Sequence, residues 1–441
     1  MPDYPINPNS KANTTMQLSK MVALQLAALS GVAQAGGLYV GEFGQPNQGA
    51  SRAGAHALAE DASTAAQNPA GIMFLDSGST MITAIGINSE IEFDQDDQLS
   101  ATPPAVANAD GSRPASDGGD AGGWAVGAAS FHASQVNDRW GWGVALTSIS
   151  GAILDHEDGQ DFAGRYWATD VELLTITLLP SLSYKLTDDV SVGLGVPVMM
   201  AMLDMDVIVP GAVAGAPEGK AEIEDGDDFV AGINLSAHWR VSDTTNIGVQ
   251  YVSELELDFD SDLSLTLPPG ELPESVDSSV EFVYPQTLRA SLTHDLNSTV
   301  TLLTSVAWEE WSAFEDIAIS TPAGTDKLRR DWDDTWHYSV GLRWKPEPSW
   351  TYYTGVAYDT DPTQASDRTT DQPIDEQWRY SGGVTYTRDN GHRIGAVMTY
   401  ADYGDAAISN GGNRPGTGDP WTVDGDYSSN RLVFIGLHYS W

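Results

Sequence analysis

The sequence predicts an all-β membrane protein: a 14-stranded antiparallel transmembrane β-barrel whose lumen holds an N-terminal plug. Three observations predict this fold class. Apolar and polar residues alternate with a period of two after residue 78, tryptophan and tyrosine lie near the ends of the alternating segments, and the connections alternate between short and long. In a membrane barrel the apolar face meets lipid, the polar face lines the lumen, and amphipathic rings favour the two membrane interfaces.

The chain begins with a predicted signal peptide, residues 1–35. Lysines precede an apolar run over residues 21–33, and the tripeptide "AQA" at its end fits a small-x-small cleavage site. The run is too short to span a bilayer as a helix. An ordinary N-terminal helix is the alternative, and which of the early methionines starts the chain stays open. Cleavage at this site makes Gly36 the expected mature N-terminus.

Residues 36–78 do not alternate and are predicted to form the plug. A glycine-rich start leads to a small-residue helical segment over residues 51–66, which runs into Asn68-Pro69-Ala70. Pro69 lacks a backbone N–H and disfavours a helical backbone at Asn68, so the helix must end there. The lumen of a fourteen-stranded barrel is too wide for side chains alone to fill, and a compact segment of this length is suited to fill it.

Residues 79–441 are predicted to form the barrel. The clearest alternation lies in "TWHYSVGLRWK", where Trp336, Tyr338 and Val340 share one face and polar residues share the other. The segments predicted as strands are 79–93, 121–134, 139–151, 171–187, 189–207, 228–241, 245–265, 278–296, 299–319, 334–345, 349–360, 377–388, 391–404 and 429–441. Their number is even, as closure of an antiparallel barrel requires.

The connections between these segments differ in length. The short ones are rich in turn residues, such as "TDD", "SDTT" and "DNG". The long ones cover residues 94–120, 151–170, 208–227, 266–277, 320–333, 361–376 and 405–428. Because short and long connections alternate, all long loops must emerge on one side, as in outer-membrane barrels. A soluble β-sandwich, the alternative interpretation, has no reason to sort its loops in this way.

The composition excludes some partners. The 441 residues contain no cysteine and carry 62 Asp+Glu against 21 Lys+Arg, a formal net charge of −41. So acidic a surface repels phosphate groups, and we expect no nucleic-acid partner. The acids concentrate in the long connections, where a solvated loop surface explains them, and their spacing fits no EF-hand. We therefore predict no metal site and no cofactor.

Several stretches are similar to those of one known family. They include "GGLYVGEFG" at residues 36–44, "ALAEDASTAAQNPAGI" at 57–72, "WGWGVALTSISG" at 140–151 and "DEQWRYSGGVTY" at 375–386. In these stretches, and over essentially the whole mature chain, the sequence resembles the FadL-type outer-membrane transporters of long-chain fatty acids and other hydrophobic compounds.

The resemblance implies a mechanism. It implies that the plug, called the hatch in that family, closes the lumen from the periplasmic side. It further implies that external loops capture the ligand, that an internal apolar pocket holds it, and that a kinked early strand opens the wall sideways to the bilayer. The mature N-terminus of the family moves when ligand arrives, and this mobile segment matches Gly36, Gly37 and Leu38.

The hatch motif of the family matches Asn68, Pro69 and Ala70, and the resemblance implies that it packs against the kinked strand. By its order along the chain, that strand is expected at residues 139–151. Three of its glycines permit a kink or bulge: Gly141, Gly143 and Gly151.

Two sets of residues are candidates for the ligand pocket. The first set consists of adaptable methionines, which could instead face lipid or merely pack the lumen; they are Met199, Met200 and Met202. The second set consists of arginines at lumen-facing positions, which could hold a carboxylate or instead pair with internal acids; they are Arg289, Arg343 and Arg379.

We expect passive, downhill transport across the outer membrane of a Gram-negative bacterium, by a monomer surrounded by outer-membrane lipid. Long-chain fatty acids are the first expected cargo, because each methylene gains about 0.8 kcal/mol on leaving water. Some fatty-acid members of the family carry a basic residue after the strand that reads "MMAMLDMDV" here, and this chain has none there. Neutral alkanes or aromatic hydrocarbons are therefore the alternative cargo. A general porin or a structural surface barrel is the alternative of another class.

An enzyme is not expected. The sequence contains no G-x-S-x-G motif, and its eight histidines are scattered. Glu309 and Glu310 are adjacent, so on a strand they point to opposite faces and cannot act as a carboxylate pair.

Overall fold

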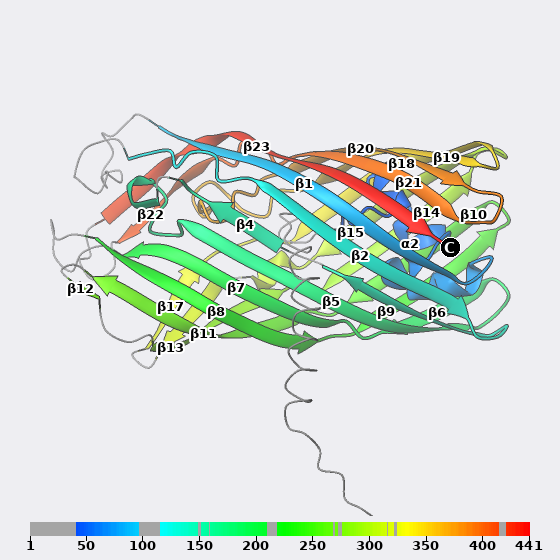
Figure 1. Cartoon of the computed structure of the whole chain (residues 1–441), viewed down its shortest axis with the longest axis horizontal. Helices are drawn as coiled ribbons and strands as arrows, with labels where there is room; N and C mark the ends of the chain where they lie inside the picture. Colours follow the sequence, from blue (N-terminus) through cyan, green and yellow to red (C-terminus); the bar gives the residue numbers. More distant parts are fainter. Residues whose placement is uncertain are drawn as a thin grey trace, which may run out of the picture.

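The alternating segments pair edge to edge into a closed antiparallel β-barrel. The computed structural model describes residues 41–96, 115–148, 151–157, 159–209, 218–267, 270–271, 276–314, 316–321, 324–413 and 420–441. Within these residues, 23 strands form a single sheet. The first strand, β1 (Ser79–Gln95), pairs with the last, β23 (Pro420–Ser440), and this pairing closes the barrel. Figure 1 shows the strands running along the long axis, with the short helices of the N-terminal segment (blue) at one end.

The other strands follow in chain order. They are β2 (Trp124–Gln135), β3 (Trp140–Thr147), β4 (Gly151–Asp155), β5 (Asp170–Lys185), β6 (Val190–Gly195), β7 (Val198–Val209), β8 (Gly219–Ala231), β9 (Asn234–Ser242), β10 (Thr245–Val252), β11 (Leu255–Leu267), β12 (Gly270–Glu271), β13 (Val276–Tyr284), β14 (Thr287–Asp295), β15 (Val300–Glu309), β16 (Asp316–Thr321), β17 (Gly324–Arg329), β18 (Thr335–Glu347), β19 (Trp350–Asp359), β20 (Gln377–Thr387), β21 (Arg393–Asp402) and β22 (Ile408–Asn413). The helices are η1 (Pro46–Ala50), α2 (Ala55–Leu58), α3 (Thr64–Gln67), η2 (Pro69–Phe74), η3 (Gly159–Asp161) and η4 (Trp311–Ala313).

Fourteen spans make up the wall in the described part of the chain, because several spans consist of two strands in series. The two-strand spans are β3 with β4, β6 with β7, β8 with β9, β10 with β11, β13 with β14, β15 with β16, β17 with β18, and β21 with β22. The single-strand spans are β1, β2, β5, β19, β20 and β23. The predicted fold class and the predicted number of strands are both confirmed.

Five of the long connections contain strands that the sequence did not lead us to expect. Strand β4 lies within the predicted loop 151–170, β8 begins inside 208–227, and β12 lies within 266–277. Strand β17 lies within 320–333, and β22 with the start of β23 lies within 405–428. The prediction of pure loops was wrong there. The reason is that the wall continues past the apolar band as antiparallel pairs, so its strands no longer carry the lipid-facing pattern used to find them.

The barrel has two halves of opposite polarity. The turn half is the end formed by β3, β6, β9, β10 and β14, and the loop half is the end formed by β4, β8, β11, β13 and β16. In the turn half, outward positions carry exposed apolar residues such as Leu194, Leu235 and Leu437. In the loop half, outward positions carry exposed acids such as Glu224 and Asp258. The turn half therefore presents its apolar face to lipid, and the loop half presents an acidic face to water.

Several spans change the parity of their inward-facing residues at the boundary between these halves, among them the β10/β11 span and the β13/β14 span. On β10 the even-numbered Gln250 is buried inside, whereas on β11 the odd-numbered Leu257 and Phe259 are. The change occurs at residues 253–254, between the two strands. Pro285, which cannot donate to a strand ladder, separates β13 from β14 at the same kind of change. Each interruption keeps acids outside and apolar side chains inside.

Aromatic side chains mark the edges of the apolar band. At the turn end, the rings of Trp140 and Tyr184 lie 4.7 Å apart, and those of Trp350 and Tyr386 lie 4.8 Å apart. Towards the loop half, Tyr358 and Trp378 form a similar outward pair at 4.8 Å. None of the helices in the described residues is long and apolar enough to cross a membrane.

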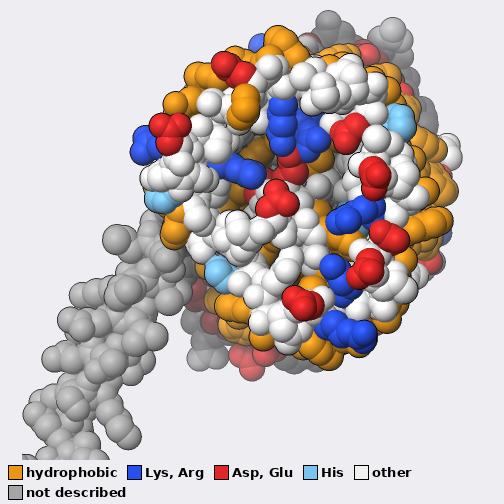
Figure 2. All heavy atoms as spheres, turned by 90° about the vertical axis from the view of Figure 1, so that its right-hand side faces the viewer, with side chains coloured by type: hydrophobic (Ala, Val, Ile, Leu, Met, Phe, Trp, Pro, Cys, Tyr) orange, Lys and Arg blue, Asp and Glu red, His pale blue; other side chains and the backbone are white. Residues whose placement is uncertain are grey.

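The described part of the plug, residues 41–78, lies inside the turn half. Figure 2 shows this end of the barrel, with hydrophobic side chains around its rim and charged side chains across its interior. Glycines on the inner wall let the plug backbone touch the wall backbone. A Cβ on Gly355 would lie 2.2 Å from the Ala50 carbonyl oxygen, and one on Gly436 would lie 2.5 Å from the Gly44 Cα. The plug is therefore held by close backbone contact.

Candidate functional site

The predicted mobile N-terminus, Gly36, Gly37 and Leu38, lies outside the described residues. The described part of the plug begins at Gly41.

The hatch motif is fixed by hydrogen bonds to the plug and to the wall. The side-chain amide of Asn68 donates to the carbonyl of Ala237 at 3.0 Å, and its Oδ1 accepts from the N–H of Ala70 at 3.1 Å. Ser191 donates from Oγ to the Ala70 carbonyl at 2.6 Å, and the Ala70 N–H also donates to Ser236 Oγ at 3.0 Å. Asn68 thus caps η2, which begins at Pro69.

These contacts differ from the ones that the resemblance implied. The motif touches β6 and β9, through Ser191, Ser236 and Ala237. It is the next residue but one, Ile72, that packs on the expected strand, β3. A Cβ on Gly141 would lie 2.9 Å from Ile72 Cγ2.

The expected kink residues fall into two groups. Gly141 and Gly143 lie in a regular part of β3, paired with β2 and β5 without a register shift, so they are not a kink. Their lack of a side chain instead admits the plug, because a Cβ on Gly143 would lie 2.7 Å from Ala65 Cβ. Strand β3 ends at Thr147, and Gly151 is the first residue of the next strand, β4. Of the three glycines, only Gly151 lies at the junction between β3 and β4.

A lateral gap opens in the wall where β3 is followed by β4. Strands β2 and β3 pair up to Ser130 opposite Leu146. Beyond that point, residues 124–129 of β2 pair with β1, and β4 pairs with β5. Three main-chain hydrogen bonds of the described residues join the segment before β2 to β4 and the segment after it. The Asp155 N–H donates to the Ala121 carbonyl at 3.2 Å, the Ser116 N–H donates to the Asp161 carbonyl at 2.8 Å, and the Ala163 N–H donates to the Ser116 carbonyl at 2.9 Å. In the part of the wall that the structure describes, β2 and β4 therefore form no ladder at the height of the parity changes.

A cavity of about 120 Å³ lies between the plug and the wall at this height. Its apolar lining comes from Phe43 of the plug and from Phe131, Leu179 and Leu255 of the wall. Thr147, the last residue of β3, also lines it, so the cavity reaches the edge of the lateral gap.

An apolar cluster fills the loop half above the cavity. The rings of Trp311 and Trp332 lie 5.2 Å apart, and Phe314 packs 4.9 Å from both Phe282 and Trp332. Leu255 belongs to this cluster and also lines the cavity, so the two are in direct contact. Sequence reasoning missed these aromatic residues. The run "LELDFD" carried a signal for other members of the cluster, Leu255, Leu257 and Phe259, because its apolar residues alternate with acids rather than with the small polar residues of a lumen.

The three candidate methionines do not share a face. Met199 is fully buried in the apolar cluster of the loop half. Met200 and Met202 lie on the opposite, outward face of β7, between Val198 and Asp204, and both are partly exposed. The prediction of one methionine-lined pocket is therefore corrected: because strand residues alternate, only Met199 points inside.

The three candidate arginines pair with internal acids. Arg289 forms an ion pair with Glu309 at 3.2 Å. Arg343 pairs with the plug residue Glu60, and its other nitrogen donates to Thr301 Oγ1 at 2.7 Å. Of these two arginines, only Arg289 lines the cavity.

Arg379 is buried between two acids. It pairs with Asp359, and its Nε lies 3.6 Å from a carboxylate oxygen of Glu42 in the plug. Arg379 is absent from the cavity lining, where a basic residue that sequence reasoning missed, Arg52, appears instead. Nothing local in the sequence marks Arg52, because its position depends on how the plug folds.

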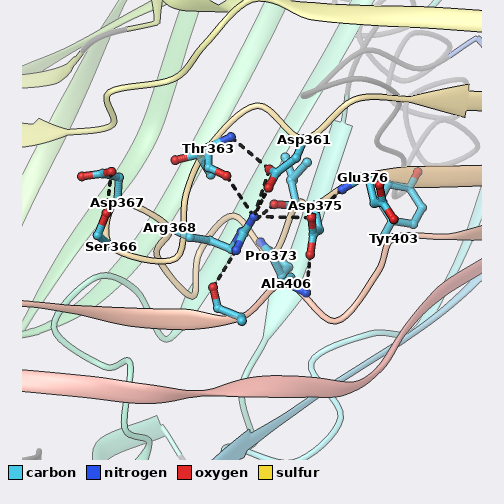
Figure 3. Close-up of polar contacts among 12 residues, drawn as sticks. Asp361, Thr363, Ser366, Asp367, Arg368, Pro373, Asp375, Glu376, Tyr403 and Ala406 are labelled. Carbon is cyan, nitrogen blue, oxygen red and sulfur yellow. Dashed lines mark hydrogen bonds and ion pairs between the residues drawn. The ribbon is translucent and has the colours of Figure 1, made fainter.

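Buried arginines join the long loops at the far end of the barrel. Figure 3 shows Arg368, whose guanidinium donates to both carboxylate oxygens of Asp361 at 2.9 Å and to the carbonyls of Ile374 and Ala407 at 2.7 and 2.6 Å. Arg330 pairs in the same way with Asp371 at 2.6 Å. These charge-assisted bonds hold the loops over the apolar cluster.

One histidine of these loops is kept neutral by burial. The ring of His156 stacks on Phe162 at 3.7 Å between centroids. Desolvation lowers the pKa of His156 to about 4, against a slight opposing attraction from Asp371.

Comparisons with known proteins agree with this geometry. The family described as "Outer membrane protein transport protein (OMPP1/FadL/TodX)" matches residues 26–439. A long-chain fatty acid transport protein of Escherichia coli O6:H1 is 24% identical over 421 residues, covering 88% of this chain and 91% of that protein. Outer membrane protein P1 of Haemophilus influenzae is 21% identical over 401 residues, covering 83% and 86%.

Solved structures share the fold. A Pseudomonas aeruginosa FadL homologue superposes with a TM-score of 0.83 at 22% identity, covering 92% of this chain and 99% of that one. The Ralstonia pickettii toluene transporter TbuX superposes with a TM-score of 0.65 at 16% identity, covering 90% and 98%.

Proposed function

Because the chain belongs to the outer membrane protein transport family that includes OMPP1, FadL and TodX, we propose that it carries long-chain fatty acids and related hydrophobic molecules passively into the cell. The chain is an outer-membrane β-barrel of a Gram-negative bacterium. The observation that supports the proposal most is the contact between the apolar cluster of the loop half, the cavity and the lateral gap, which Leu255 and Thr147 connect.

This arrangement suits a molecule that must avoid water. Each methylene of an acyl chain gains about 0.8 kcal/mol on leaving water, so a water-filled pore offers such a molecule nothing. An interior lined by Trp311, Phe314 and Leu255 keeps the chain in an apolar environment. The gap between β2 and β4 then leads from the cavity to the bilayer. The route needs no energy source, and flux follows the concentration gradient.

A neutral hydrocarbon is the second candidate cargo. The apolar cluster consists of uncharged, largely aromatic side chains, and a toluene transporter shares the fold. Mass spectrometry of the compounds that co-purify with the detergent-extracted protein separates the two candidates: a carboxylic acid supports the first, and an alkane or arene supports the second.

The route can be tested by closing the lateral gap with a disulfide. The next cross-strand pair in the β2–β3 register is Ala129 with Thr147. The chain has no cysteine of its own, so Ala129→Cys with Thr147→Cys introduces a single pair. We expect the oxidised protein to bind oleate but to lose its transport into lipid vesicles, and dithiothreitol to restore transport.

The reduced protein and the two single variants are the matched controls. Unchanged transport through the oxidised protein would exclude the gap as the exit. Rapid entry of sugars into vesicles carrying the unmodified protein would instead indicate a general porin.

A further inference from the structure

We infer that Arg52, on the plug, recognises the anionic head group of the cargo and makes the cavity selective for carboxylic acids over neutral lipids. The inference rests on the proposed function. It adds the preferred class of substrate, carboxylic acids, and the residue that binds their head group. It differs from the sequence-based candidates, which were all on the wall.

The cavity is amphipathic. Apolar side chains line the part next to the lateral gap, whereas Arg52, His56 and Arg289 line another part. The same three residues also border a second, smaller cavity of about 20 Å³, with Glu309 and His337 on its other side. The basic residues thus stand between the apolar cavity and a buried group of charges.

The charges of this group are unevenly shared. Arg289 forms an ion pair with Glu309 at 3.2 Å, and Arg379 forms ion pairs with both Asp359 and Glu42. Glu42 also attracts Arg52 electrostatically. Within the described residues, however, no ion pair or side-chain hydrogen bond reaches the Arg52 guanidinium.

A guanidinium in this position favours an incoming anion. Burying a cation without a partner is costly, and a carboxylate that reaches it forms charge-assisted, often bidentate hydrogen bonds. Arg52 is only partly buried and is one of the residues that line the cavity. A fatty acid fits this arrangement with its head group at Arg52 and its tail along Phe43, Phe131 and Leu179. A neutral ester or hydrocarbon gains nothing from Arg52.

The backbone around Arg52 holds its side chain in place. Ser51 and Arg52 have φ values of 50° and 59°, a left-handed conformation that is uncommon outside glycine. The Arg52 N–H donates to the Asn47 carbonyl at 3.2 Å. The guanidinium lies over Gly41, where a Cβ would be 1.9 Å from Nη1. Such local strain persists only where the surrounding structure supports it, and it is concentrated at ligand sites.

The test compares an acid with its ester. Radiolabelled oleic acid and methyl oleate are titrated against the detergent-solubilised protein and its Arg52→Gln and Arg52→Lys variants. We expect the unmodified protein to bind the acid at least about tenfold more tightly than the ester. Arg52→Gln should lower the affinity for the acid to that for the ester without changing ester binding, and Arg52→Lys should retain most of the preference. Arg139→Gln, at an exposed turn, is the matched control.

Each outcome has a distinct meaning. Equal binding of acid and ester, unaffected by Arg52→Gln, would overturn the inference while leaving hydrophobic transport in place. Loss of the preference in Arg289→Gln but not in Arg52→Gln would place recognition on the wall and also overturn it. Binding of neither compound would count against the proposed function itself. Heat-dependent migration of the folded barrel on gels shows which variants are folded, and the Lys variant keeps the charge if the Gln variant does not fold.

Discussion

The two halves of the barrel use the same alternation for opposite purposes. In the turn half, Leu194 and Leu235 face outward and small residues face the plug; in the loop half, Asp258 faces outward and Phe259 faces inward. The strands are continuous in geometry, so the difference comes from what surrounds them. Where lipid surrounds the barrel, the apolar face of each strand points outward, and where water surrounds it, the apolar face points inward. Many of the acids that give the chain its net charge of −41 therefore lie on the outer surface of the loop half.

The largest effect should come from placing a charge on the lipid-facing side. Leu235→Arg puts a cation into the apolar band and should reduce the free energy of unfolding by about 2–4 kcal/mol if it lies near the bilayer midplane. Asp258→Arg, outward in the loop half, should change it by less than about 0.5 kcal/mol. Urea unfolding in lipid vesicles measures both. Equal effects at the two positions would contradict the view that lipid covers the outer face of the turn half and water covers that of the loop half.

A smaller effect should distinguish the inner from the outer wall of the turn half. Gly355→Ala places a methyl group 2.2 Å from the Ala50 carbonyl oxygen, and overpacking of this kind costs about 1–3 kcal/mol. Gly382, on the neighbouring strand β20, has no atom within 4 Å of its Cβ position, so Gly382→Ala is the matched control. We expect protease to cut the plug faster in the first variant only. Equal cleavage of both variants would show that the plug does not depend on backbone contact.

The smallest effect should appear in the loop half as pH falls. The pKa of His156 in the folded protein, about 4, lies below its ordinary value of about 6.5, so protonation favours opening of the loop. Stability is therefore full above pH 6.5 and is lost gradually as pH falls towards 4, by up to about 1.4 kcal/mol at pH 5.5. Hydrogen exchange of residues 151–157 measures this change.

His156→Phe should remove that pH dependence, whereas His392→Phe, at the turn end, should leave it in place. A loop whose exchange rate responds to pH equally in both variants would mean that another group controls it.

Local patterns carried most of the fold. The period of two, the sorted loop lengths and the break at Pro69 were sufficient to predict the number of spans and an N-terminal segment inside the lumen, because each depends on neighbours in the chain. Strand parity alone already separates Met199 from Met200 and Met202. The parity changes at residues 253–254 and at Pro285 could have been found from the acids of "LELDFD" and from the proline.

The site was less accessible to such reasoning. Whether Arg289, Arg343 or Arg379 is available to a ligand depends on acids that are distant in sequence, since Arg343 pairs with Glu60 across 283 positions. The contacts of the hatch motif with β6 and β9, and the location of Arg52, likewise depend on how the plug settles against the wall. Alternation predicts which face of a strand a residue lies on, but it does not predict which side chain from another part of the sequence contacts it there.

The place where the plug meets the closing strands bears on how the protein is made. Gly44 lies against Ala84 and Leu437, whose strands β1 and β23 seal the cylinder, and its carbonyl contacts the His438 ring at 3.0 Å. Synthesis runs from the amino end, so this contact joins one of the earliest parts of the mature polypeptide to one of the last. We therefore expect the plug to be in place when β1 and β23 pair, because it forms part of the surface on which these strands close.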